Sequence, residues 1–168
     1  MTKITLYTID PEKYFNKVVK ILKLVKKDGL IYVTTNKTYD SVIKICQKNK
    51  IDPKTIFFID CISKQVGIDK NKEPENCLFL ESPQSLTSIG IAISQSVNYF
   101  KKSTVLFLDS LSTLLIYNDA ATIYKFSNFL FNKMRSEKID TIILALESDI
   151  EKDIIKQIQS LADEVRKA

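Results

Sequence analysis

The residues best placed to do chemistry are polar side chains that directly follow short apolar runs. They are Thr34, Thr35, Asp60, Asp109 and Ser110. Where such runs form parallel strands, their carboxyl ends meet at one edge of the sheet, and ligands bind outside that edge. Carboxylate and hydroxyl oxygens gathered there could hold Mg²⁺. The alternative, for each residue taken singly, is that loops begin where strands end and loops are polar.

The absence of histidine from the chain removes several kinds of chemistry. Ser-His-Asp and Cys-His catalysis and histidine-ligated zinc all require it. The three cysteines are widely spaced and form no CxxC pair, so we expect neither a disulfide framework nor a cysteine-rich metal site. We therefore expect no metal centre; if a metal binds at all, Asp109 is the expected ligand.

Strand-like and helix-like segments alternate along the chain. Runs of β-branched and aromatic residues predict strands at 4–9, 30–34, 56–60, 77–81, 104–109 and 141–146. Apolar residues recurring every three or four positions predict helices at about 10–28, 39–50, 82–97, 119–135 and 149–162. Gly29 is expected to end the first helix. The alternation predicts right-handed βαβ units, and hence a three-layer α/β/α sandwich with a mainly parallel central sheet.

Length and composition indicate a single domain over residues 1–168. Globular domains have ~100–200 residues, and a hydrophobic content of 45% with 27% charged residues is ordinary for one. The N-terminus has no apolar signal segment, and no apolar run approaches the ~18 residues of a membrane span. Together with the isolated cysteines, this predicts a cytoplasmic protein that does not bind membranes.

Asp109 stands out among the strand-end residues because of what precedes it. An apolar strand, 105–108, ends in this aspartate, which is the form of a Walker B motif. In that motif an aspartate carboxylate orients Mg²⁺ on a nucleotide. The pattern alone is common, so the surrounding sequence decides its meaning.

The sequence after about residue 103 resembles the second half of a RecA/KaiC-like ATPase domain. The residues that carry the resemblance are LFLDSLSTLL at 106–115, YND at 117–119, the aromatic helix at 124–135, the strand at 141–146 and LADEV at 161–165. The last of these is similar to the ending of KaiC-type domains. The resemblance implies a RecA-like P-loop NTPase fold, and its style is that of archaeal members associated with signal transduction.

The chain departs from this family where phosphates would bind. A P-loop, GxxxxGK[ST], needs glycines whose N–H groups wrap the phosphates and a lysine that reaches them. Residues 10–13 instead read DPEK, with no glycine before Gly29. Pro11 lacks an N–H donor, and the two carboxylates put negative charge in the phosphate position. The family's catalytic glutamate after the second strand is replaced by TTN at 34–36, and an amide cannot accept a proton as a carboxylate does.

These losses predict a RecA/KaiC-like domain without the P-loop, which is not an enzyme and needs no cofactor. We interpret it as a pseudo-ATPase that binds or regulates a protein, with another protein or a second copy of the chain as partner. Asp109 is then a structural carboxylate that hydrogen-bonds the loop after the second strand. An aromatic cluster spreads around one helix, and any exposed member would mark an interface. The cluster is Tyr124, Phe126, Phe129 and Phe131.

Three alternatives remain open on sequence grounds. One is a residual Mg-ATP binder or weak ATPase, in which Asp109, Asp60 and residues 34–35 hold metal and phosphate. A second is a receiver-type phosphoacceptor domain with Asp60 as acceptor, although only Asp10 is placed for the acidic pair that it requires. A third is a nucleic-acid binder, because the net charge is +5 and lysines crowd the first third of the chain. We expect no nucleic-acid binding, since arginine is scarce and no recognition motif is present.

Overall fold

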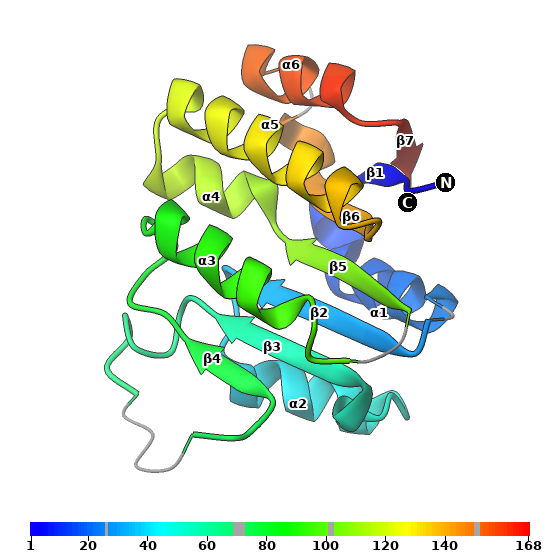
Figure 1. Ribbon diagram of the computed structural model, residues 1–168, viewed down its shortest axis with the longest axis vertical. Coiled ribbons are helices and arrows are strands. Elements are labelled where there is room, and N and C mark those ends of the chain that lie inside the picture. Colours follow the sequence, from blue (N-terminus) through cyan, green and yellow to red (C-terminus); the bar gives the residue numbers. More distant parts are fainter. Residues whose placement is uncertain (26, 69–72, 101–102, 150–151) are drawn as a thin grey trace.

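The computed structural model describes residues 1–25, 27–68, 73–100, 103–149 and 152–168. Within them, seven parallel strands form one sheet in the order β4-β3-β2-β5-β6-β1-β7 (Figure 1). The strands are β1 (Ile4–Ile9), β2 (Gly29–Thr34), β3 (Ile56–Asp60), β4 (Cys77–Phe79), β5 (Thr104–Asp109), β6 (Asp140–Leu146) and β7 (Glu164–Lys167). The chain therefore crosses from β4 through α3 to β5, and the last strand returns to the side of β1.

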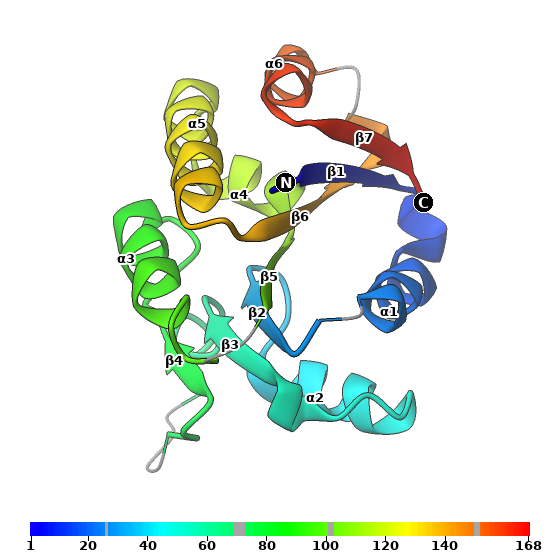
Figure 2. The ribbon, with the colours of Figure 1, turned by 45° about the vertical axis from the view of Figure 1, so that its right-hand side comes forward.

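Helices cover both faces of this sheet (Figure 2). The α-helices are α1 (Tyr14–Leu24), α2 (Tyr39–Lys48), α3 (Leu86–Ser96), α4 (Leu111–Tyr117), α5 (Ala120–Ser136) and α6 (Asp153–Leu161). Short 3₁₀ turns add η1 (Pro11–Lys13), η2 (Pro53–Thr55) and η3 (Glu147–Asp149). One apolar core lies between the sheet and α1 and α2, and a second lies between the sheet and α3 to α6. The predicted three-layer α/β/α sandwich is confirmed.

The central strands are continuous apolar runs because both of their faces are covered. Every residue of β2, β3 and β5 is buried. Along β5, Leu106 and Leu108 enter one core, while Val105 and Phe107 enter the other. Such two-sided burial is typical of parallel sheets, and it fixes the register that places the strand-end residues.

The first predicted helix begins where the pattern places it but ends early. Asp10 caps a 3₁₀ turn that leads directly into α1, and α1 ends at Leu24. Gly29 does not end the helix but begins β2. A Cβ at this position would overlap the ring of Phe100, so the strand needs glycine for close approach. The second predicted helix also ends early, at Lys48, because Lys50 adopts a left-handed conformation with φ 59°.

Further differences lie in the second half of the chain. The strand predicted at 77–81 ends at Phe79, and the helix predicted from residue 82 begins at Leu86. Helix α4 and strand β7 are not among the predicted elements. The predicted start of the last helix crosses residues 150–151, which lie outside the described residues. No helix in the described part of the chain combines the length and apolarity needed to cross a membrane.

Candidate functional site

Three of the candidate residues lie level with one another at the carboxyl edge of the sheet. Thr34 at the end of β2 pairs with Asp60 on β3 and with Asp109 on β5. Two strand spacings therefore separate the aspartates, which is about 10 Å between their Cα atoms. The edge is the expected position for a ligand, and the partners of each side chain decide what it can do there.

Asp109 is fully buried and accepts hydrogen bonds from three side chains. The hydroxyl of Tyr14 donates to its Oδ1, and the Nδ2 amide of Asn36 donates to the same oxygen at 3.1 Å. The hydroxyl of Tyr32 donates to Oδ2 at 2.6 Å. These donors come from α1, from β2 and from the loop after β2. The bond to Asn36 is the contact with the second-strand loop that the sequence predicts.

Both tyrosines are held in their protonated, donating form. Burial, and then the neighbouring Asp109 carboxylate, raise the pKa of Tyr14 well above its usual range. The same two causes, in the same order, raise the pKa of Tyr32. The ammonium of Lys37 also lies 5.2 Å from the centre of the Tyr14 ring. At neutral pH, Asp109 therefore has two tyrosine O–H donors beside it.

Thr35 joins the loop after β2 to the end of β5. Its backbone N–H donates to the carbonyl oxygen of Asp109 at 2.8 Å, and its hydroxyl donates to the same oxygen at 2.9 Å. The N–H of Ser110 donates to this hydroxyl at 2.9 Å. Ser110 also begins α4, because its side chain accepts the N–H of Thr113. The peptide bond between Asp109 and Ser110 is cis. Thr35 and Ser110 thus use their polar groups to hold the scaffold together.

Asp60 is equally buried, but its partners are mainly backbone groups. Its Oδ1 accepts the N–H groups of Ile62 and Ser63 at 2.7 and 2.8 Å. Its Oδ2 accepts the N–H of Tyr39, the first residue of α2, at 2.7 Å and the hydroxyl of Ser63 at 2.5 Å. The carboxylate therefore ties the loop after β3 to the start of α2. This environment is that of a structural carboxylate.

Thr34 is buried and stabilises a turn. Its hydroxyl donates to the carbonyl oxygen of Lys37 at 2.6 Å and accepts the N–H of Lys37 at 3.2 Å. The structure thus brings Thr35, Asp109 and Ser110 into one hydrogen-bonded group, while Thr34 and Asp60 serve separate ones. No three Cys, Asp or Glu side chains within the described ranges are grouped to share a metal ion.

The segment after β1 is a short 3₁₀ turn that leads into α1. Asp10 uses its Oδ1 to accept the N–H of Glu12 at 3.0 Å, which caps η1. Pro11 offers no N–H. Helix α1 then begins with Tyr14, whose side chain reaches Asp109. A Mg²⁺ ion at the Asp109 oxygens would compete with the tyrosine and asparagine donors that the carboxylate already has.

Sequence reasoning missed the two tyrosines that define this site. Tyr32 lies in the middle of an apolar strand, where it resembles ordinary strand composition. A buried tyrosine usually finds a hydrogen-bond partner for its hydroxyl, so a tyrosine inside a fully apolar strand is a usable signal. Tyr14 gives no comparable signal, because the helical pattern alone does not show which residue at the start of α1 faces the sheet edge.

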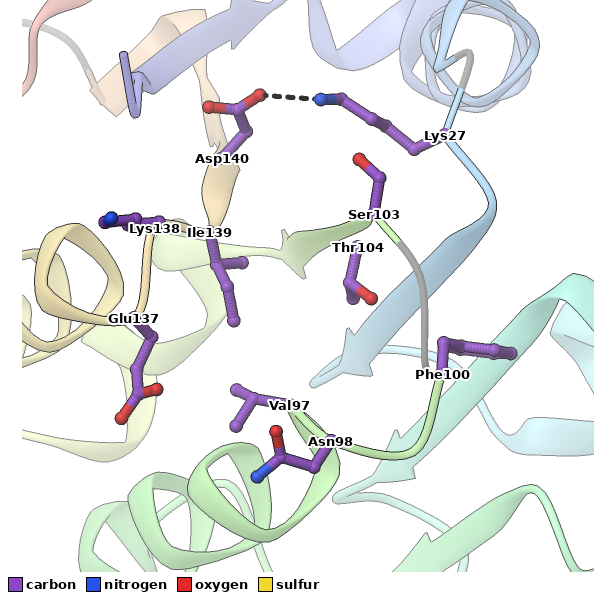
Figure 3. Close-up of a pocket in the computed structure, with 10 residues that line it drawn as sticks. All are labelled: Lys27, Val97, Asn98, Phe100, Ser103, Thr104, Glu137, Lys138, Ile139 and Asp140. Atoms are coloured by element: carbon purple, nitrogen blue, oxygen red, sulfur yellow. Dashed lines mark ion pairs between the residues drawn. The ribbon is translucent and has the colours of Figure 1, made fainter.

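A separate hollow of about 470 Å³ lies at the opposite, amino edge of the sheet. Val97 and Ile139 contribute apolar surface to it, and Lys27 faces Asp140 at 3.3 Å across one side (Figure 3). Ligands of parallel α/β sheets bind at the carboxyl edge. The hollow is thus distant from the candidate residues and shares none of them.

Comparisons with known proteins place the fold. A family model described as a family of unknown function, DUF7504, matches residues 24–166. The structure is similar to that of the KaiC-like protein PH0186 from the archaeon Pyrococcus horikoshii, with a TM-score of 0.65 and 10% identity over 97% of this chain and 69% of that one. It is also similar to the uncharacterized protein PH0321 of the same organism, which was solved in complex with an unknown peptide. There the TM-score is 0.69 and the identity 15%, over 99% of this chain and 78% of that one. No curated protein matches the chain.

Proposed function

We propose that the chain, which belongs to the DUF7504 family of unknown function and has a KaiC-like fold, is a non-catalytic RecA/KaiC-like domain. In this proposal it is a pseudo-ATPase that binds or regulates a protein and does not hydrolyse ATP. A place in signal transduction belongs to the same proposal and rests on the family resemblance.

The observation that carries the proposal is the environment of Asp109. A Walker B aspartate acts by presenting its carboxylate to Mg²⁺ on the nucleotide. Here Oδ1 accepts bonds from Tyr14 and Asn36, Oδ2 accepts one from Tyr32, and the side chain is fully buried. Removing these donors from a buried carboxylate costs free energy that Mg-ATP binding would have to offset. Asp109 therefore has the strand-end position of a Walker B aspartate but holds α1 and the second-strand loop in place.

The segment after β1 supports the same proposal. The strongest phosphate contacts in a P-loop come from backbone N–H groups of a glycine-rich turn. Residues 11–13 form a 3₁₀ turn capped by Asp10, with Glu12 in it. The carboxylates of the cap, Asp10, and of Glu12 oppose a polyphosphate by like-charge repulsion.

A protein-binding role is supported by the structural neighbour that holds a peptide. A domain of this fold that does not bind a nucleotide can still bind other chains through the surfaces of its helices. The rival function, a residual Mg-ATP binder, would use Asp109 with the Thr35 hydroxyl nearby.

Calorimetric titration of the full chain with Mg-ATP tests the proposal, together with a phosphate-release assay. We expect no saturable heat at millimolar nucleotide and no phosphate release above the buffer rate. Asp109→Ala and the matched surface variant Asp52→Ala should give the same flat titration. Saturable binding by the native chain would contradict the proposal, and its loss in Asp109→Ala alone would identify the rival function.

A further inference from the structure

The surface formed by α3 and the first half of α5 is short of charge. Residues 82–100 contain no Asp, Glu, Lys or Arg, although 27% of the chain is charged. The outward faces of surface helices normally carry charged residues, as α1 does with Lys17, Lys20 and Lys23. An uncharged helical surface on an otherwise lysine-rich protein points to a region that another chain covers.

A groove runs between these two helices, which lie side by side on one face of the sheet (Figures 1 and 2). Its volume is about 610 Å³, and its apolar lining is Leu86, Gly90, Ile91, Phe126 and Phe129. Ile91 is 54% exposed and Phe129 57% exposed, one on each wall. Phe129 is the exposed member of the aromatic cluster, since Phe126 and Phe131 are buried.

Gly90 sets the depth of the groove. A Cβ at this position would meet Cε1 of Phe129 at 3.9 Å, which is ordinary contact distance. A side chain larger than a methyl group would therefore fill the space between the two walls. With glycine, the space is open to a side chain from outside.

We propose that this groove binds an amphipathic helix of another protein, with acidic residues flanking the apolar face of that helix. Helices dock in such grooves through residues spaced i, i+3 or i+4, and i+7. Helix α3 has 11 residues and is therefore about 16 Å long, which matches three turns of a docked helix. The groove thus offers room for about three apolar anchors.

The charge of the groove selects the partner. The only charged residue of its lining is Lys125, which is exposed and makes no ion pair with any described residue. Acidic flanks on the docked helix would pair with Lys125. A second copy of the chain is disfavoured, since it would bring the same lysine and the same net charge to the interface.

This inference rests on the binding role proposed above and names a surface and a partner class for it. It does not depend on the state of the nucleotide site. Saturable Mg-ATP binding would contradict the pseudo-ATPase proposal without affecting the inference about the groove. Peptide binding that persists after the groove is blocked would contradict the inference about the groove, while the proposed protein-binding role would stand.

Selection from a display library of helical peptides tests the inference. The full chain is the bait, and the double variant Ile91→Glu, Phe129→Glu is the counter-selection. We expect peptides that bind only the native chain and share an apolar i, i+4, i+7 pattern with Asp or Glu beside it. Synthesised and labelled, the best peptide should lose at least tenfold in affinity with either single glutamate variant, by fluorescence anisotropy.

Two more variants sharpen the result. Lys125→Glu should weaken the acidic peptide several-fold, and the effect should shrink at high salt. Ser88→Glu adds a charge to an exposed position of α3 outside the groove lining and should leave affinity unchanged. Thermal unfolding of every variant should match the native chain, because the altered side chains are exposed.

Several outcomes would overturn the inference. They are a selection that yields no peptide, peptides with basic or uncharged flanks, and peptides that bind the double variant equally well. Sedimentation that shows a native dimer and a monomeric Ile91→Glu variant would assign the groove to a second copy instead.

Discussion

Two buried aspartates at the same sheet edge have opposite kinds of partners. Asp60 accepts three backbone N–H groups and one hydroxyl from residues that its own loop and α2 supply. Among the described residues, the donors to the carboxylate of Asp109 are all side chains, and they come from three separate elements. Both are fully buried. The backbone N–H donors around Asp60 are present whichever side chains those residues carry. The donors around Asp109 depend on which residues stand at positions 14, 32 and 36.

The two aspartates therefore have different structural roles. Asp60 supplies an acceptor that the backbone needs, whereas Asp109 is enclosed by side chains that donate to it. Asp60 satisfies backbone N–H groups of a loop and a helix start, which need an acceptor wherever the chain takes this path. Asp109 is surrounded by Tyr14, Tyr32 and Asn36, none of which the backbone geometry demands. Single substitutions can therefore separate the two roles.

The largest expected effect comes from Asp60→Ala. It would remove the shared acceptor of Ile62, Ser63 and the first N–H of α2, and we expect a loss of about 3–5 kcal/mol in the free energy of unfolding. Urea denaturation followed by circular dichroism measures it. The control Asp52→Ala removes only the exposed cap of η2 and should cost about 1 kcal/mol. Equal losses in the two variants would show that Asp60 is not a main support of its loop and of α2.

The next effect is a contrast between Asp60→Asn and Asp109→Asn. An asparagine amide at position 60 would point N–H groups at backbone N–H groups, which cannot turn away. At position 109 the tyrosine hydroxyls can rotate and accept from the new amide. We expect Asp60→Asn to be less stable than Asp109→Asn by about 1–2 kcal/mol, from parallel denaturation curves. The reverse order would contradict the comparison.

Alkaline pH should weaken the group around Asp109 through its two tyrosines. Because Tyr14 and Tyr32 have raised pKa values in the folded chain, the unfolded chain ionises first. Below the unfolded pKa of about 10 their contribution is fully present, and above it stability falls by up to about 1.4 kcal/mol per pH unit for each tyrosine. Melting temperatures between pH 8 and pH 11 measure this slope.

The slope has its own control. Tyr14→Phe should make the alkaline loss shallower, whereas Tyr99→Phe, at a side chain 45% exposed, should leave it unchanged. An identical slope in all three proteins would show that the Tyr14 hydroxyl does not contribute to the alkaline loss of stability.

The smallest expected effect is that of Tyr14→Phe at neutral pH. Asp109 keeps its bonds from Tyr32 and Asn36, so the variant should lose about 1 kcal/mol. Differential scanning calorimetry against the native chain measures it. A loss as large as that of Asp60→Ala would mean that Tyr14 is a main support of the fold.

The layered fold could be predicted because its signals are local. Apolar runs such as 56–60 and 104–109 begin and end in the structure where the pattern places them. Strand β7 could not be predicted in this way, since EVRK lacks an apolar pattern. It is positioned by long-range bonds instead: Asp163 accepts the N–H of Ile4 through its carboxylate and donates its own N–H to the Ile4 carbonyl.

The candidate site was predictable in position but not in chemistry. The strand ends placed Asp109, Ser110 and Thr35 at one edge, because each follows an apolar run. The partners of Asp109 depend on how α1 sits above that edge, and periodicity does not fix this. The missing glycines after β1 predict that the chain has no phosphate site, whereas the contact of Tyr14 with Asp109 is visible only in the structure.

Following the Tyr14 hydroxyl while nucleotide is added shows whether Mg-ATP can reach Asp109. The chain is labelled with ¹³C at Cζ of tyrosine, and Tyr14→Phe assigns the resonance in the NMR spectrum. We expect the Tyr14 signal to stay in place at millimolar Mg-ATP, because the hydroxyl remains bonded to Asp109. A shift of this signal that saturates with Mg-ATP would show that the nucleotide displaces Tyr14, and it would contradict the pseudo-ATPase proposal.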